Sequence, residues 1–144
     1  MSPLKMNHIC FSVSDLDRSI AFYQEVFEAK LLVKGRRLAY LDLDGLWLAL
    51  NQEDIERTDL PNSYTHMAFS MEEKEYDQLL ERLERAQAKV LPGRERVPRD
   101  RQSIYFLDPD GHMFEFHAGT LAERLDYYRA AKPHMQFFEE QLEN

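Results

Sequence analysis

Two hexamers, His8-Ile-Cys-Phe-Ser-Val13 and His66-Met-Ala-Phe-Ser-Met71, share their His, Phe and Ser positions and lie 58 residues apart (66 − 8). Each is followed by a segment with the hydrophobic spacing of a helix. A second matching pair comes later in each half: Asp42-Leu-Asp-Gly45 before an apolar run, and Asp108-Pro-Asp-Gly111 before another. Matches that recur in the same order indicate an internal duplication, so the two halves are predicted to share one fold.

The predicted unit is βαβββ, and it occurs twice. Module one (6–52) has strands over 6–13, 30–34, 36–43 and 46–51, and its helix begins at the capping sequence Ser14-Asp-Leu-Asp17. Module two (63–118) has strands over 64–71, near 89–91, and over 102–107 and 112–117, with a helix over 72–87. The capping box Thr120-Leu-Ala-Glu123 predicts a C-terminal helix over 120–131. The expectation is one α+β domain over 1–138 with a tail, 139–144.

Alternation along the strands separates an apolar face from a mixed face. In the first strand Ile9, Phe11 and Val13 lie toward the helix, while His8 and Cys10 lie on the other side. The same division holds in every predicted strand. We therefore expect the mixed faces of the two sheets to turn inward and enclose a cleft.

Two histidines and one carboxylate on the mixed faces form a candidate metal site. His8 and His66 are repeat-equivalent, and Glu115 lies between two phenylalanines, with Ala49 at its equivalent position in module one. An unpaired buried carboxylate is costly, and a divalent metal would satisfy all three groups. The ligand types do not choose among Mn, Fe, Zn, Ni and Mg. Three protein ligands leave coordination positions open, as in catalytic sites.

The three other histidines are predicted not to bind the metal. They are His112, His117 and His134. His117 shares the face of Glu115, but it lies two residues further along the strand. We therefore expect its ring to project away from the metal.

Several side chains could line the pocket. Cys10 could be a nucleophile, but a small lining residue is favoured because no base accompanies it in the sequence. Arg124, with Tyr128 one turn later, could close over an anion, or it could be a surface residue paired with Glu123 or Asp126. A loop that is eight residues longer in module two carries a basic cluster predicted to bind an anion: Arg94, Arg96, Arg99 and Arg101. Hydrogen-bond donors and an apolar wall are supplied by Tyr64, Tyr105, Asn51 and Trp47.

The composition excludes several classes of function. A formal net charge of −8 argues against nucleic-acid binding. No apolar stretch approaches the roughly 18 residues that span a bilayer, and none is of the signal-peptide type. The single cysteine fits a reducing compartment, so a cytoplasmic protein is expected.

The sequence resembles the vicinal oxygen chelate superfamily, also called the glyoxalase/bleomycin resistance superfamily. Within it, the chain is similar to fosfomycin-resistance thiol transferases, specifically the bacillithiol-using metallothiol transferases of Gram-positive bacteria. The resemblance runs from about Met6 to Phe137. It rests on the stretches Asn7-His-Ile-Cys-Phe-Ser-Val13, Gly45-Leu-Trp-Leu-Ala-Leu-Asn51, Ser63-Tyr-Thr-His-Met-Ala-Phe-Ser70, Gly93-Arg-Glu-Arg96, Ser103-Ile-Tyr-Phe106, Asp108-Pro-Asp-Gly-His-Met-Phe-Glu-Phe-His117 and Leu125-Asp-Tyr-Tyr-Arg-Ala-Ala-Lys-Pro-His-Met135.

The resemblance implies a site and a reaction. A metal on His8, His66 and Glu115 would be Mn or Mg, with Zn, Ni or Co as alternatives. The nucleophile would be bacillithiol or L-cysteine, and Val97-Pro-Arg-Asp-Arg-Gln102 replaces the potassium-binding loop of glutathione-using relatives. A homodimer with exchanged modules is implied, with fosfomycin as substrate. The implied catalytic residues are Glu115, Tyr105, Arg124 and Cys10, and Cys10 would lie beside the epoxide. The implied phosphonate pocket comprises Tyr64, Tyr105, Arg94, Arg124, Trp47 and Asn51. Tyr128 is predicted to lie beside this pocket.

Two other functions remain open at the level of sequence. A ring-cleaving dioxygenase would use the same ligands to hold Fe(II) and would consume oxygen. A metal-free drug-binding module would keep its ligand affinity when His66 is replaced.

Overall fold

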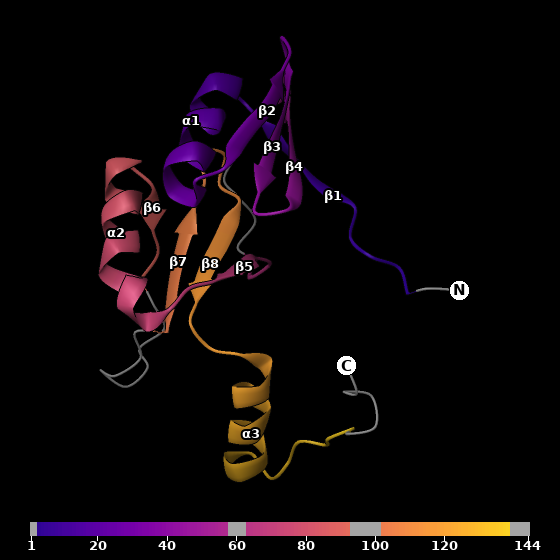
Figure 1. Cartoon of the computed structure of the whole chain (residues 1–144), viewed down its shortest axis with the longest axis vertical. Helices are drawn as coiled ribbons and strands as arrows, with labels where there is room; N and C mark the ends of the chain where they lie inside the picture. The colour runs from indigo at the N-terminus through magenta and orange to yellow at the C-terminus, as the bar shows by residue number, and fades with distance from the viewer. Residues whose placement is uncertain (1–2, 58–62, 93–101, 139–144) are drawn as a thin grey trace.

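Two four-stranded sheets, each with a helix of its own module, form the body of the chain (Figure 1). The structure is a computed structural model, and it describes residues 3–57, 63–92 and 102–138. Module one comprises β1 (His8–Val13), α1 (Leu16–Phe27), β2 (Lys30–Lys34), β3 (Leu38–Leu43) and β4 (Leu46–Gln52). Module two comprises β5 (Met67–Ser70), a short 3₁₀ helix η1 (Glu73–Glu75), α2 (Tyr76–Arg85), β6 (Lys89–Val90), β7 (Ser103–Leu107) and β8 (Met113–His117). The helix α3 (Leu121–Ala131) follows. The predicted α+β fold of paired βαβββ modules is confirmed.

Strand register confirms the duplication residue by residue. The sheets have the orders β1-β4-β3-β2 and β5-β8-β7-β6, and in each the first strand runs parallel to the last. Cys10 pairs with Ala49 in one sheet, and Ala68 pairs with Glu115 in the other. Ala49 is therefore the structural counterpart of Glu115. By the same comparison of registers, Tyr40 is the counterpart of Tyr105.

Several element boundaries differ from the predictions by a few residues, while others agree. Asp15, not Ser14, caps α1, because its carboxylate accepts the hydrogen bond from the Arg18 backbone N–H. The strand β5 begins at Met67, so the preceding residues of the predicted strand have no ladder partner. Thr120 caps α3 as predicted, since its hydroxyl accepts from the Glu123 backbone N–H at 3.1 Å.

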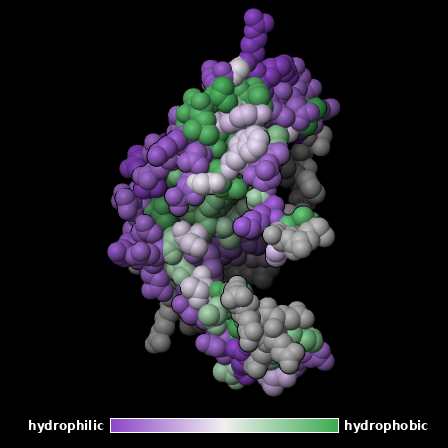
Figure 2. Space-filling model, turned by 45° about the vertical axis from the view of Figure 1, so that its right-hand side comes forward, coloured by the Kyte–Doolittle hydropathy of each residue, from purple (hydrophilic) through white to green (hydrophobic). Residues whose placement is uncertain are grey.

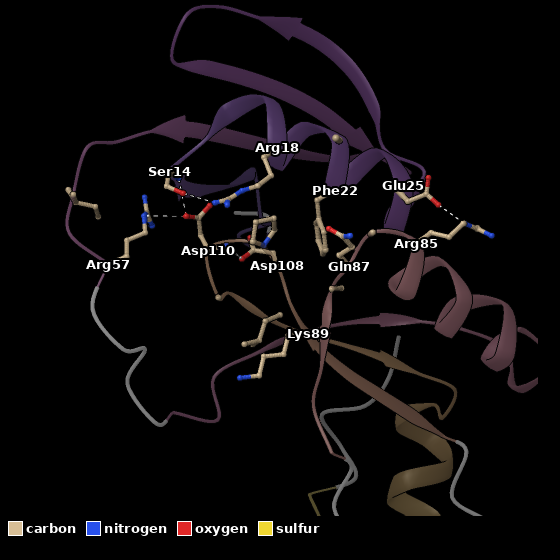
Figure 3. Close-up of a pocket in the computed structure, with 17 residues that line it drawn as sticks. Ser14, Arg18, Phe22, Glu25, Arg57, Arg85, Gln87, Lys89, Asp108 and Asp110 are labelled. Carbon is tan, nitrogen blue, oxygen red and sulfur yellow. Dashed lines mark hydrogen bonds and ion pairs between the residues drawn. The ribbon is translucent and has the colours of Figure 1, made fainter.

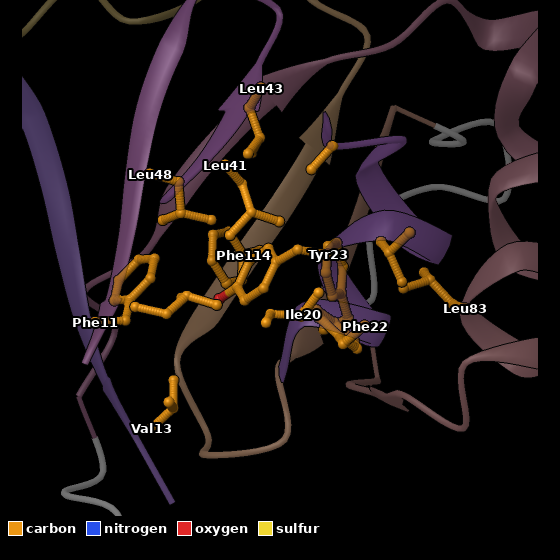
Figure 4. Packing of buried hydrophobic residues seen from close by; sticks show 14 of the residues in the cluster. Phe11, Val13, Ile20, Phe22, Tyr23, Leu41, Leu43, Leu48, Leu83 and Phe114 are labelled. Atoms are coloured by element: carbon orange, nitrogen blue, oxygen red, sulfur yellow. The ribbon is translucent and has the colours of Figure 1, made fainter. Parts of the chain in front are cut away.

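The apolar faces of both sheets share one core (Figure 4). Phe27 of module one has ring contacts with Phe69 at 4.9 Å and Phe114 at 5.3 Å in module two. Because this core joins the modules through their helix-side faces, the mixed faces point outward, and His8 and Cys10 are exposed. The prediction that mixed faces turn inward to enclose a cleft is therefore wrong for a single chain.

A buried carboxylate joins the two modules beside this core. Asp108 accepts hydrogen bonds from the Tyr23 hydroxyl and from His112 Nδ1, each at 2.7 Å. Its other oxygen accepts from the backbone N–H groups of Asp110 and His112. Burial and the adjacent Asp108 raise the pKa of Tyr23, so the phenol stays a donor. The β7–β8 turn is thereby held against α1.

The neighbouring Asp110 extends this junction. Its carboxylate accepts from the Ser14 backbone N–H at 3.0 Å and pairs with the Arg57 guanidinium at 3.3 Å (Figure 3). The three residues come from the β7–β8 turn, the start of α1 and the segment after β4. The turn therefore contacts two separate parts of module one.

The helix α3 lies apart from both sheets, at the end of the chain that follows β8 (Figure 1). In the space-filling view it forms a separate lobe below the body (Figure 2). Leu121 and Tyr127 on it are more than half exposed. No helix in the described part of the chain is long and apolar enough to cross a membrane.

We predict that Tyr23→Phe lowers the free energy of unfolding by about 1.5–3 kcal/mol, the usual worth of a hydrogen bond to a charged group. The change removes one donor from a carboxylate that stays buried. Thermal and urea unfolding measure it. Tyr127→Phe, on an exposed ring, is the matched control and should stay within about 0.5 kcal/mol of wild type. Equal stability of the two variants would show that Asp108 does not depend on Tyr23.

Candidate metal centre

The mixed face of module two gathers most of the predicted site residues into one cluster, which we call the second half-site. His66 precedes β5, and its Nδ1 lies 2.7 Å from the Tyr64 carbonyl oxygen. A carbonyl can only accept, so Nδ1 carries the proton and Nε2 is left to face Glu115 Oε1 at 3.2 Å. In neutral imidazole this places a lone pair against a carboxylate oxygen, a contact that a cation relieves. The donor set therefore fits a divalent metal.

The second oxygen of Glu115 is already occupied. Ser103 Oγ lies 2.5 Å from Oε2, and His117 Nδ1 lies 2.8 Å from Ser103 Oγ and 3.2 Å from Oε2. His117 thus lies at Oε2, while His66 faces Oε1, and the prediction that the His117 ring projects away from the metal stays a prediction. The His117 ring folds back onto Ser103, and Glu115 is 7% exposed beneath these groups.

Two tyrosines complete the second half-site. The hydroxyls of Tyr64 and Tyr105 lie 2.7 Å apart, and the Tyr105 ring contacts His66 edge to face. Burial, followed by the hydrogen bond to Tyr64 and the nearby Glu115 carboxylate, raises the pKa of Tyr105. The phenol is therefore neutral at physiological pH. Tyr105 thereby joins Tyr64 to the Glu115 carboxylate, to which its hydroxyl is also hydrogen-bonded.

The remaining predicted residues lie on the mixed face of module one, the first half-site. His8 Nδ1 lies 2.6 Å from the Asn7 side-chain oxygen, and its ring stacks on Trp47 at 4.5 Å. As in His66, Nδ1 donates and Nε2 is left free, an arrangement typical of metal-binding histidines. Asn51 is exposed at the end of the same strand as Trp47.

Cys10 lies between these residues as a lining group. Partial burial, and then the Glu53 carboxylate, raises the pKa of the Cys10 thiol. A raised pKa disfavours the thiolate, which is the nucleophilic form. The surroundings of Cys10 therefore fit a residue that lines the pocket better than they fit a nucleophile.

One chain does not bring the two half-sites together. The side chains that contact Glu115 come from module two, and His8 is not among them. Among residues 3–57, 63–92 and 102–138, no three His, Cys, Asp or Glu side chains form a group that could hold a metal. The predicted ligand set thus divides into His8 on one surface and the His66–Glu115 pair on another.

The predicted anion-binding arginines are only partly located. Arg124 in α3 lies over the Tyr128 ring, with Cζ 5.9 Å from its centroid, so the predicted shared side of the helix is confirmed. Asp126, considered as an ion partner of Arg124, pairs with Arg129. The basic cluster Arg94, Arg96, Arg99 and Arg101, and the loop that replaces the potassium-binding loop, fall largely in 93–101, outside the described residues.

A hollow of about 1,070 Å³ between the modules contains none of the predicted site residues (Figure 3). Two of its arginines form ion pairs: Arg57 with Asp110 at 3.3 Å and Arg85 with Glu25 at 2.9 Å. The first pair joins the segment after β4 to the β7–β8 turn, and the second joins α2 to α1. The hollow therefore lies at the boundary between the modules, whereas the candidate site lies on the mixed faces.

Sequence reasoning missed two residues of the two half-sites, Ser103 and Tyr40, and gave a third, His117, no contact there. Ser103 precedes Tyr105 by two residues, so strand alternation places both on one face. His117 follows Glu115 with the same spacing. Tyr40, whose ring contacts Trp47 at 5.1 Å, is the repeat counterpart of Tyr105. The period-two pattern was present for all three.

The sequence and the fold both match known proteins. Residues 5–116 match the family model described as the Glyoxalase/Bleomycin resistance protein/Dioxygenase superfamily. The metallothiol transferase FosB of Lysinibacillus sphaericus is 58% identical over 139 residues, 96% of this chain and 99% of the relative. Metallothiol transferase FosB of Staphylococcus epidermidis is 49% identical over 141 residues, 97% of this chain and 99% of that one.

Solved structures agree with the sequence matches. The fosfomycin resistance protein FosX of Listeria monocytogenes is 36% identical with a TM-score of 0.74, covering 89% of this chain and 99% of its own. A variant of that protein, solved with Mn(II) and 1S,2S-dihydroxypropylphosphonic acid, gives a TM-score of 0.75 at 36% identity, covering 88% of this chain and 99% of its own.

We predict that Glu115→Ala abolishes metal retention and leaves the fold largely intact, because the equivalent strand of module one already carries Ala49. Elemental analysis of the purified variant and circular dichroism provide the two measurements. Glu81→Ala, on the exposed side of α2, should retain metal as wild type does. A Glu115→Ala protein with full metal content would remove this carboxylate from the site.

Proposed function

The chain belongs to the Glyoxalase/Bleomycin resistance protein/Dioxygenase superfamily and, within it, to the metallothiol transferases, and we propose that it adds bacillithiol to the epoxide of fosfomycin. The observation that carries this proposal is the His66–Glu115 pair, whose facing nitrogen and oxygen could both bind one cation beside the two tyrosine hydroxyls. His66 and Glu115 would hold the metal together with His8. When bound, a divalent metal supplies a Lewis acid that stabilises negative charge on the epoxide oxygen.

Side chains of the second half-site would bind the phosphonate. The Tyr64 and Tyr105 hydroxyls, which lie 2.7 Å apart, would donate to a phosphonate oxygen in place of their present partners, and the raised pKa of Tyr105 keeps its hydroxyl protonated. Arg124 and Arg94 would balance the charge of the anion. Holding the phosphonate orients the epoxide carbon for in-line attack by the thiolate, which the cosubstrate supplies. A carbon–sulfur bond then forms as the carbon–oxygen bond breaks, and the resulting alkoxide takes up a proton.

The complete site would need a homodimer with exchanged modules. In one chain both mixed faces point outward, and the His8 surface is separate from Glu115. Apolar side chains stay exposed on the N-terminal segment and on α3, including Leu4, Met6 and Leu121. Large exposed apolar surface is typical of interfaces. Docking the first half-site of one chain on the second half-site of its partner would bring His8, Cys10 and Trp47 over Glu115.

The thiol, the metal and the cellular compartment are each proposed on separate grounds. The loop over 97–102 differs from that of glutathione-using relatives, which favours bacillithiol, with L-cysteine as the alternative. The ligand types do not choose the metal, and Mn or Mg is proposed because a related protein is described with Mn(II). A thiol cosubstrate and a single cysteine both suit a reducing compartment, so we propose the cytoplasm.

Turnover with fosfomycin tests the proposed reaction directly. Purified protein is incubated with Mn or Mg and with bacillithiol, L-cysteine or no thiol, and the products are identified by mass spectrometry. The expected product is the thiol adduct, formed faster with bacillithiol. Three other outcomes would each point to a different function. One is a diol formed by addition of water, and another is oxygen uptake with Fe(II) and a catechol. The third is fosfomycin that stays unchanged and is bound by His66→Ala with wild-type affinity.

Mixing two inactive variants tests the shared site. His8→Ala and Glu115→Ala should each be inactive as homodimers. Coexpressed, half of the dimers are mixed, and each has one intact site of two, so about a quarter of wild-type activity should return.

The matched control coexpresses His66→Ala with Glu115→Ala. These residues lie in the same half-site, so mixing places at least one defect in every site and no activity should return. Recovery in neither mixture would mean that all ligands come from one chain.

A further inference from the structure

Glu115 is held by two residues that the proposed reaction does not use. Ser103 projects from β7 and His117 from β8, and their side chains meet at Glu115 Oε2. Glu115 Oε1 faces the other way, toward His66 Nε2 at 3.2 Å. The two carboxylate oxygens therefore have different surroundings.

Counting donors fixes the direction of each hydrogen bond. An ionised carboxylate only accepts, so the single hydroxyl proton of Ser103 is donated to Oε2. Ser103 Oγ can then only accept from His117, which means that His117 Nδ1 carries a proton and offers no lone pair on this side. His117 is thus excluded as a ligand through Nδ1, and the chain His117–Ser103–Glu115 runs in one direction.

We propose that Ser103 and His117 are positioning residues for Glu115. They occupy Oε2 and leave Oε1 as the oxygen available to the metal. Carboxylate ligands are commonly oriented by such hydrogen bonds, and a single available oxygen keeps a coordination position free for substrate. The inference rests on the proposed metal centre and extends it to side chains that need not touch substrate.

Gly119 shows that the place of the His117 ring depends on the absence of a side chain. A Cβ built on Gly119 would lie 2.7 Å from His117 Nε2, too close for both to stay. Gly119 is thus required for the position in which His117 reaches Ser103. It offers a way to move the ring without altering His117, Ser103 or Glu115.

Mn(II) affinity, measured by electron paramagnetic resonance of the free ion, tests the proposal. Ser103→Ala should raise the dissociation constant roughly 10- to 100-fold, the usual effect of losing a hydrogen-bond partner of a metal ligand. Ser103→Thr, which keeps the hydroxyl, and His117→Asn, which keeps a donor near Nδ1, should stay close to wild type. Ser70→Ala is the matched control, because it removes a hydroxyl from β5 of the same sheet, where Ser70 pairs in register with His117.

Gly119→Ala provides a second test through a double-mutant cycle. In the wild-type background it should weaken Mn(II) binding, while in His117→Ala it should add almost nothing, since the displaced ring is absent. Thermal unfolding of the metal-free proteins is measured in parallel. Equal loss of affinity in both backgrounds would mean that Gly119 acts on the fold, and would overturn the role given to His117.

Two outcomes would overturn the proposal for Ser103. One is Mn(II) affinity in Ser103→Ala equal to that of wild type. The other is a fall in kcat/KM for fosfomycin at saturating Mn(II) with unchanged metal affinity, which would make Ser103 a substrate contact. Failure of the metal centre itself is distinguishable, because Glu115→Ala would then keep its metal.

Discussion

The buried carboxylate of Asp108 is the contact on which the arrangement of the two modules depends. It receives four hydrogen bonds, one of them from Tyr23, which lies 85 residues away in the sequence. A buried carboxylate with an unfilled oxygen is costly, so the β7–β8 turn and α1 can take few relative positions. Since β8 leaves this turn and carries Glu115, the junction also positions the carboxylate of the metal centre.

That junction determines which faces of the sheets meet. The aromatic core on the helix side, with Phe27 between Phe69 and Phe114, uses the apolar face of each sheet. The faces that carry His8 and His66 are then left on the outside. A chain built this way carries two half-sites, and both would contribute to the proposed metal centre. In the proposed homodimer, dimerisation would complete that centre, and the exposed apolar side chains of α3 would lie at the interface.

Much of the fold could be predicted because the sequence contains an internal duplication, so each half supports the prediction for the other. Alternation and the two repeat offsets predicted the strands, their mixed faces and the equivalence of Ala49 with Glu115, which the register confirms. The outward orientation of the mixed faces could not be predicted, since it depends on Tyr23 meeting Asp108 across the modules. The contacts of the His117 ring with Ser103 and Glu115 were not predicted, because alternation gives the face of a residue but not its rotamer. Here that rotamer depends on Ser103 and on the space beside Gly119.

Ala49 pairs with Cys10 where its repeat counterpart brings a carboxylate. A duplicated module that kept a glutamate in both halves would place two anionic ligands on one divalent ion and cancel its charge. With the two imidazoles and one carboxylate of the proposed centre, the ion would keep a net positive charge, which would favour approach of a phosphonate and strengthen polarisation of a bound oxygen. On the proposed function, the difference at this one position after duplication would make the centre electrophilic, and the first module would contribute the wall of the pocket.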